Sequence, residues 1–429
     1  MLASTMLPLA LAGVAASIVP SASASPVQLA GRAPTLSGSD GTVSRDLLQR
    51  DFTQAVERSV AHLSARTTKK DEDCKVPRRS RKAKRSSTSV PLSNEGDAAY
   101  LASISIGTPA QELSVMIDTG SGDLVVPKVT AGSPAPKGAF DSKKSRTFIK
   151  GDGSKTVFTY AVGAAVGEVV QDKVRIGNYV KIKQPFGLAD EMKSPPFGIL
   201  GLAFSSISKI DGPTFLDRLV QDKNLDKNLF GLYHSRGSAP GSQLTLGAID
   251  ASRYTGELTA TPVVSHTHWT VQLNHATIDG QSIYDGPVFS AVDSGSSTTV
   301  IPKAIADDYF ARVPGSSADP NLNITTTISG KTVVGQIYEY PCDAHLPALG
   351  FVFEGSDRVF EIAAEDMFIP QPPYSADKPK DETCFSSIVG ADVIYYGQKA
   401  ALIGVPFLKS FYSVFNLDDS TVSFATARH

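Results

Sequence analysis

The sequence is poor in cysteine, tryptophan and long apolar runs. Its 429 residues include one tryptophan and three cysteines. So few cysteines argue against a small scaffold held by disulfides. Beyond residue 24 no apolar run is long enough to span a bilayer, and the carboxyl-terminal residues lack the hydrophobic tail of a lipid anchor. We therefore expect no membrane anchor. Long amphipathic stretches are few, which favours a mostly β protein, and the length allows two lobes and an extension.

Net charge is also small, but it is unevenly distributed. Residues 1–85 contain 14 Lys and Arg against 7 Asp and Glu, whereas the rest of the chain contains 27 against 36. A basic leader on an acidic body suggests a prosegment that docks electrostatically. A disordered basic linker is the alternative.

The first residues have the pattern of a secretory leader. Residues 7–19 are apolar, and Ala-Ser-Ala at 22–24 is a small-x-small cleavage signal, although no Lys or Arg precedes Arg32. Residues 1–24 are therefore predicted to be a signal peptide. Secretion is the expected destination, with an acidic vacuole as the alternative.

Residues 25–85 are predicted to be a propeptide with one helix, at about 43–64. They end in the dense basic run 78–85, which could be a nucleic-acid patch. Because this run precedes the folded region and the body is acidic, a processing site is favoured, with cleavage after Arg85 by a kexin-like protease. No nucleic-acid partner is expected.

One short motif occurs twice. Asp-Thr-Gly-Ser at 118–121 follows the apolar run 115–117, and Asp-Ser-Gly-Ser at 293–296 follows another apolar pair. A strand, an Asp and a tight Gly turn present a carboxylate at a loop tip. Either turn alone would be ordinary. Together, 175 residues apart, the two turns predict a pair of carboxylates, one from each lobe, that share a proton and activate water against an amide bond.

A second repeat supports two related lobes. Ile-Leu-Gly at 199–201 follows the first Asp turn, and Leu-Ile-Gly at 402–404 follows the second. Each puts a glycine on a strand where backbone must approach closely. Other strands are expected at 99–106 and 113–117, with a hairpin and a further strand over 157–180. Short helices are expected at 213–220 and 307–313.

Two cysteines lie in the body and one, Cys74, lies in the leader. An oxidising secretory route would let Cys342 and Cys384 pair, closing a loop of 42 residues. Such a loop stabilises by roughly 4 kcal/mol in a chain-entropy model. Zinc binding is the alternative interpretation, although two Cys without nearby His make a poor site. The one N-glycosylation sequon found begins at Asn323.

These features are those of a known family. From about Pro91 to Thr426 the chain resembles the pepsin-like aspartic endopeptidases, particularly secreted fungal ones. The landmarks are the stretch 104–111, both Asp turns, 197–203, 254–256, the two body cysteines, 402–404 and 411–415. The resemblance implies an all-β, bilobal fold with a deep cleft between two pseudo-symmetric β lobes, predicted at 86–258 and 259–429.

The resemblance also implies a mechanism and partners. Asp118 and Asp293 would be catalytic, one ionised and acting as general base on water, the other protonated and bonded to the scissile carbonyl. Expected partners are protein and peptide substrates, with bulky apolar residues preferred, and the chain's own propeptide, from which Lys69, Lys70 or another base would contact the dyad. A monomer is expected because one chain supplies both turns. No metal or organic cofactor is expected.

Supporting roles follow by the same resemblance. Six residues would support the dyad: two hydroxyls lock the loops together, two glycines make room for backbone, and two serines bond the outer carboxylate oxygens. In that order these are Thr119 and Ser294, Gly120 and Gly295, and Ser121 and Ser296.

The predicted flap departs from the family pattern. Tyr160 matches the tyrosine that closes over substrate. It is followed by Ala161 and Val162 where the family has Gly and Thr or Ser. Val125 replaces a common Trp that anchors this tyrosine, and Gly122 replaces a common Ser. We therefore expect a more mobile flap and an altered preference or lower rate. A non-catalytic peptide-binding relative is the competing hypothesis.

Overall fold

The computed structural model describes residues 86–129, 138–160, 164–192, 197–237, 239–318, 323–328, 331–369, 383–395 and 398–429. All of these belong to one compact unit. The predicted signal peptide, the propeptide with its helix, and the cleavage site at Arg85 lie outside them, so these assignments stay predictions. Within the described part, no helix is both long and apolar enough to cross a membrane.

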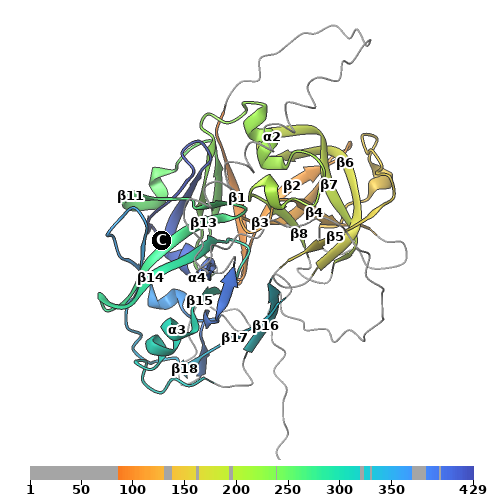
Figure 1. The fold of residues 1–429 in the computed structure, drawn as a ribbon. Helices are drawn as coiled ribbons and strands as arrows, with labels where there is room; N and C mark the ends of the chain where they lie inside the picture. The colour runs from red at the N-terminus through yellow and green to blue at the C-terminus, as the bar shows by residue number, and fades with distance from the viewer. Residues whose placement is uncertain are drawn as a thin grey trace, which may run out of the picture. The chain divides into compact units, whose positions relative to one another are not determined.

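A large mixed sheet holds the strands of the first half of the body (Figure 1). Three strands from later in the sequence extend it at one edge, because β25 pairs with β9 and β26 pairs with β11. The order of its 13 described strands is β11-β26-β25-β9-β10-β1-β2-β3-β8-β4-β7-β6-β5. Their bounds are β1 Thr88–Glu95, β2 Ala99–Ile106, β3 Gln111–Asp118, β4 Leu124–Pro127, β5 Lys155–Thr159, β6 Ala164–Ile176, β7 Tyr179–Met192, β8 Gly198–Gly201, β9 Leu229–Tyr233, β10 Gln243–Leu246, β11 Tyr254–Pro262, β25 Phe411–Asn416 and β26 Thr421–Ala427.

A second mixed sheet of 11 described strands is built from the later part of the chain. Its main path is β16-β17-β22-β15-β24-β14-β13-β19-β20, with β12 on β13 and β23 on β24. The bounds are β12 Ser265–His266, β13 Trp269–Ile278, β14 Gln281–Val292, β15 Thr299–Ile301, β16 Asn323–Ile328, β17 Lys331–Gln336, β19 Leu349–Phe353, β20 Phe360–Ile362, β22 Ile388–Gly390, β23 Val393–Tyr395 and β24 Gln398–Ile403.

The two body cysteines form a disulfide. A small separate sheet pairs β18 (Glu339–Pro341) with β21 (Thr383–Phe385), and Cys342 is bonded to Cys384 beside it. The disulfide interpretation is therefore confirmed over the zinc alternative.

The predicted all-β class is confirmed: two large mixed sheets hold most of the described residues, and helices are few. The predicted division between residues 258 and 259 falls inside β11, and the lobe boundaries stay a prediction. The strand predicted over 99–106 coincides with β2, and the region 157–180 contains the hairpin β5–β6 and the start of β7.

Helices α2 (Phe215–Gln221), α3 (Lys303–Phe310) and α4 (Val405–Ser410) are short. Helix α2 begins near where the sequence predicts, because Thr214 and Asp217 form a capping box. Helix α3 begins four residues before its predicted start, directly after Pro302, whose fixed φ suits a helix entry. The remaining helical turns are 3-10 segments, η1 Ser142–Lys144, η2 Ser205–Ile207, η3 Ala251–Arg253 and η4 Ala364–Asp366.

The single tryptophan lies in the core where the two sheets meet. Trp269 on β13 is fully buried and packs against Phe230 of β9 and Phe415 of β25, with ring centroids 5.8 and 5.3 Å away. Phe204 lies 4.6 Å from the same ring. Aromatic rings from both sheets therefore share one apolar core.

A buried ionic cluster also links distant parts of the chain. Lys409, at the end of α4, is almost fully buried, and its Nζ lies 3.1 Å from Asp97 on the β1–β2 turn and 3.5 Å from Asp366 on η4. Arg236, after β9, donates two hydrogen bonds to Asp366. Because each buried charge here has a partner, the loss of one leaves another uncompensated.

We predict that Lys409→Met lowers the free energy of unfolding by about 3–5 kcal/mol, because it strands Asp97 in the interior. Lys303→Met is the matched control: its partner Asp307 is an exposed i,i+4 neighbour, so the change should stay within about 1 kcal/mol. Urea unfolding of both variants measures the difference. Equal effects would contradict a structural role for the cluster.

Candidate active site

Each Asp turn follows a strand that pairs in parallel with the strand carrying its glycine repeat. In the first sheet Asp118 lies opposite Gly201, and in the second Val292, the residue before Asp293, lies opposite Ile403, the residue before Gly404. The two turns therefore occupy equivalent positions, as the repeat predicts.

The repeated glycines lie where backbone crowds the turns. A Cβ on Gly201 would stand 2.5 Å from the Ser121 carbonyl oxygen, and one on Gly404 would stand 2.7 Å from the Ser296 carbonyl oxygen. Real Cβ atoms do not come this close, so both positions require glycine. The close approach predicted from the sequence is observed.

The two turns are locked together by a reciprocal pair of hydroxyls. The Thr119 Oγ1 accepts a hydrogen bond from the Ser294 N–H at 2.9 Å, and the Ser294 Oγ accepts one from the Thr119 N–H at 3.1 Å. Each hydroxyl donates to a backbone carbonyl of the other turn's strand, Thr119 to Val292 at 2.8 Å and Ser294 to Ile117 at 2.7 Å. Both side chains are fully buried. Four hydrogen bonds thus fix one loop against the other.

The two carboxylates meet at this junction. A Cβ on Gly120 would stand 2.5 Å from Cγ of Asp293, and a Cβ on Gly295 would stand 2.7 Å from Cγ of Asp118. Each glycine therefore leaves space for the other turn's carboxylate. Within its own turn, each glycine also donates its N–H to the neighbouring carboxylate, both at 2.8 Å.

The third pair of supporting residues is not symmetric. The Ser121 hydroxyl donates to Asp118 Oδ2, as predicted. The Ser296 hydroxyl instead donates to the Thr298 carbonyl at 2.8 Å, so the prediction that it bonds Asp293 is wrong. Ser296 sits where its own turn leads into β15, and its hydroxyl bonds a backbone carbonyl two residues on. Within the described residues, Asp118 thus has a hydroxyl donor and Asp293 has none.

The surroundings of Asp293 raise its affinity for a proton. Burial, and then the negative charge and hydrogen bond of Asp118, raise the pKa of Asp293 well above its usual range. The N–H groups of Gly295 and Gly120 oppose the rise. Two carboxyl groups that are hydrogen-bonded to each other cannot both ionise cheaply. One of them therefore holds a proton over a pH range where the other is charged.

Tyr160 lies beside the dyad with an unusual hydroxyl. Its side chain packs against two apolar clusters, one containing Met116 and the other Val125, and its hydroxyl is buried without a hydrogen-bond partner in the described part of the chain. Burial, with the charges of Asp118 and Asp123, raises its pKa. Ala161 and Val162, the predicted flap residues after it, lie outside the described residues.

The position of the missing anchor is filled by apolar packing. Val125 is fully buried in a cluster with Phe158, and the Phe158 ring lies against Gly187. A tryptophan at 125 would have to displace that ring, so the substitution Val125→Trp would change packing as well as the hydrogen bonding of Tyr160.

Asp123 is a buried acid near the dyad that sequence reasoning missed. Its carboxylate accepts hydrogen bonds from the Ser208 hydroxyl at 2.5 Å and from the Lys209 N–H at 2.8 Å, and burial raises its pKa. The sequence signal that could have found it is its position, five residues after Asp118.

Other predicted positions lie away from the dyad. Asn323 begins β16, and its use for glycosylation stays a prediction. Within the described chain, no group of three or more His, Cys, Asp and Glu side chains could hold a metal ion.

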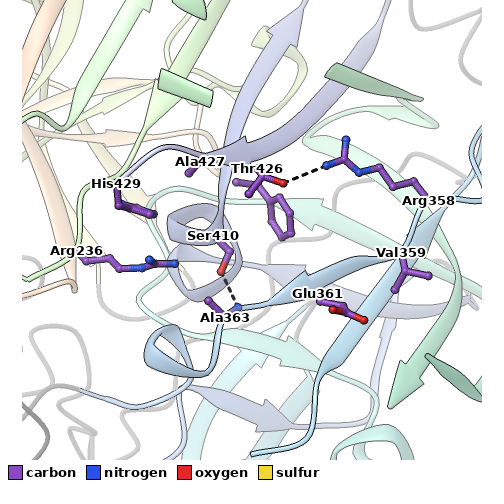
Figure 2. A pocket seen from close by; sticks show the side chains of 10 residues that line it. Arg236, Arg358, Val359, Glu361, Ala363, Ser410, Thr426, Ala427 and His429 are labelled. Atoms are coloured by element: carbon purple, nitrogen blue, oxygen red, sulfur yellow. Dashed lines mark hydrogen bonds between the residues drawn. The ribbon is translucent and has the colours of Figure 1, made fainter. Parts of the chain in front are cut away.

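A separate pocket of about 330 Å³ contains neither Asp turn (Figure 2). Its two arginines already have partners, since Arg358 donates to Thr426 at 3.2 Å and Arg236 binds Asp366. Ser410 accepts from the Ala363 N–H at 3.0 Å. The lining residues are Arg236, Arg358, Val359, Glu361, Ala363, Ser410, Phe411, Thr426, Ala427 and His429. The polar groups of this pocket hold strands and η4 together.

Comparison with known proteins agrees with this geometry. The sequence profile of the eukaryotic aspartyl protease family matches residues 99–427. The chain belongs to the eukaryotic aspartyl protease family. Its class of activity is that of an aspartic-type endopeptidase.

Similar curated proteins cover most of the chain. A pregnancy-associated glycoprotein of Equus caballus is 32% identical over 346 residues, covering 79% of this chain and 83% of its own. Chymosin of Ovis aries is 31% identical, with 79% and 84% covered. Cathepsin D of Gallus gallus is 29% identical, with 78% and 82% covered. These three relatives are animal proteins, so the resemblance to the fungal branch stays a prediction.

We predict that Thr119→Val destabilises the protein by about 1–3 kcal/mol, because it leaves the Ser294 N–H and the Val292 carbonyl buried without partners. Thr119→Ser keeps the hydroxyl and should retain most of the stability. Thermal or urea unfolding compares the two. A loss in Thr119→Ser that exceeds the loss in Thr119→Val would mean that packing of the methyl group, and not the reciprocal hydrogen bonds, is what matters.

Proposed function

We propose that this aspartic endopeptidase works in acid through Asp118 and Asp293, with water as the nucleophile. The observation that carries the proposal is the reciprocal fit of the two turns, in which each glycine leaves room for the opposite carboxylate. Two carboxyl groups held this way share one proton. In pepsin, such a pair of carboxyl groups titrates in two well-separated steps, both in acid.

The roles of the two acids follow from their surroundings. Asp118 accepts from the Gly120 N–H and the Ser121 hydroxyl, and bonds of this kind favour the ionised form. Asp293 lacks the hydroxyl donor and has a raised pKa because of its burial and the nearby charge of Asp118. We therefore assign Asp118 as the base and Asp293 as the acid at the start of a turnover.

The reaction then needs only these groups and the substrate. Asp118 takes a proton from water as the water oxygen bonds to the scissile carbonyl carbon, and Asp293 gives its proton to the carbonyl oxygen. In the second step the proton on Asp118 passes to the amide nitrogen and the C–N bond breaks. The new carboxyl group returns a proton to Asp293, which restores the starting state.

Tyr160 is proposed to cover the substrate from the flap. Its ring lies against residues near the first turn, and its hydroxyl has no partner within the described chain. A hydroxyl without an anchor is free to meet substrate when the flap closes. The lack of an anchoring partner supports the expectation of a mobile flap.

The finer biology follows from resemblance and charge. We propose that the chain is made as a zymogen of a secreted, fungal-type enzyme, with an acidic vacuole as the alternative destination. The basic leader would dock on the acidic body, and acidification would weaken that docking by protonating carboxylates. A preference for bulky hydrophobic residues around the cut bond is part of the same proposal.

We predict that hydrolysis of a neutral peptide by leader-free enzyme is highest in acid and falls as pH rises. Activity needs the proton on Asp293, so it is lost as pH rises through the raised pKa of that group. Asp293→Asn should lower kcat by at least about a hundredfold at every pH, since the general acid is removed. The measurement is kcat/KM from pH 2 to 8 with and without pepstatin.

Asp285→Asn is the matched control, because Asp285 is an exposed acid on β14, the strand that leads into Asp293, and its replacement should leave the pH profile unchanged. Folded wild type that shows no dyad-dependent cleavage would favour a non-catalytic peptide-binding protein instead.

A further inference from the structure

A histidine lies at the tip of a short hairpin that is tied to the first Asp turn. Strands β12 and β13 pair Ser265 with Thr270 and His266 with Trp269, so Thr267 and His268 form the two-residue turn. His268 lies directly before the buried Trp269. The hairpin belongs to the second sheet, whereas Asp118 ends a strand of the first.

Two hydrogen bonds tie this hairpin to the backbone of the first Asp turn. The indole N–H of Trp269 donates to the Leu202 carbonyl at 2.9 Å, and the Leu202 N–H donates to the Asp118 carbonyl at 2.8 Å. The Ser206 hydroxyl also donates to the His266 carbonyl at 2.6 Å. The hairpin tip therefore has a fixed position close to Asp118.

The imidazole of His268 is only lightly engaged. It is half-buried, and its Nδ1 lies 3.3 Å from the hydroxyl of its neighbour Thr267. No hydrogen bond to its Nε2 is formed by the described part of the chain. The neighbouring His266, by contrast, bonds Ser420 at 3.0 Å and packs on Phe204. His266 is thus held by packing and a hydrogen bond, while Nε2 of His268 is available to bind a substrate group.

We propose that His268 is a specificity-determining residue that favours an anionic side chain in the substrate close to the cut bond. This rests on the proposed function, since it assumes that Asp118 marks the place where substrate lies. A protonated imidazole held beside the dyad attracts a carboxylate of the substrate, and a partly buried charge is screened less than an exposed one. The favoured substrates are proteins with an Asp or Glu next to an otherwise apolar cleavage site.

The preference depends on the charge of His268, which is set by its burial and by Asp118. Burial lowers the pKa of His268, and the negative charge of Asp118 on β3 opposes that shift. His266 on β12 is also held below its usual pKa by burial, and Asp293 follows β14. Because the pKa of His268 is lowered, the imidazole is charged in acid and becomes neutral as pH rises through a value below 6.5. The preference should be present in acid and fade toward neutral pH.

Paired peptides test this directly. A neutral parent peptide cleaved by the enzyme is varied at each of three positions on either side of the cut, with cysteic acid in one member and asparagine in the other. The sulfonate stays ionised across the acid range, so only the enzyme titrates. The ratio of the two kcat/KM values cancels the pH dependence that both peptides share.

The wild type should cleave the cysteic acid peptide roughly fivefold better at one position at pH 4, and the ratio should fall toward one by pH 7. His268→Gln should bring the ratio close to one at every pH. His268→Lys should keep the preference at both pH values, because its amine stays charged. His275→Gln is the matched control on β13, since His275 is exposed and paired with Asp285.

The inference is overturned if no position favours the sulfonate, or if the preference survives in His268→Gln. If the glutamine variant fails to fold, a preference in His268→Lys that does not fade at pH 7 supports the inference, and one that fades as in wild type contradicts it. Cleavage of the neutral parent, and its loss in Asp293→Asn, report separately on the proposed function.

Discussion

The reciprocal hydrogen bonds between Thr119 and Ser294 are the constraint on which the site depends. Each hydroxyl accepts from the backbone of the opposite turn and donates to the strand behind it, so neither turn can shift without breaking buried bonds. The carboxylates are held in contact by this lock, despite the cost of bringing two like charges together. The groups that hold the two carboxyl groups together are therefore backbone and hydroxyl groups that take no part in the chemistry.

The lock is symmetric, but the acids that it holds are not. The Ser121 hydroxyl serves Asp118, while Ser296 turns away to a backbone carbonyl. Asp293 has a raised pKa, caused mainly by its burial and then by the charge of Asp118. In the proposed mechanism, two related halves thus supply one acid and one base.

Sequence reasoning was most successful where residue identity alone limits the backbone. The two Asp turns and the crowded glycines at 201 and 404 follow from local patterns that few structures satisfy. The pairing of Cys342 with Cys384 was predicted because they are the two cysteines of the body on an oxidising route. Sequence reasoning failed at Ser296, because the same residue type in an equivalent turn bonds a backbone carbonyl instead.

Long-range contacts were the other limit. Sequence reasoning could not find Asp123, which bonds Ser208, 85 residues further along the chain. It also missed His268, whose hairpin is placed by the bond from Trp269 to Leu202. The extension of the first sheet by β25 and β26 was missed for the same reason, since strand pairing at long range leaves no local signal.

The central claim is that Asp293 holds the shared proton, and carboxyl carbon NMR tests it most directly. Protein labelled with ¹³C at the aspartate side-chain carboxyl carbon is titrated from pH 2 to 8, with Asp118→Asn and Asp293→Asn used to assign the two signals. The account predicts that Asp293 stays protonated well above the usual range of an aspartate in wild type, and titrates lower once Asp118 is replaced. Two signals that titrate independently near the usual aspartate value would contradict it.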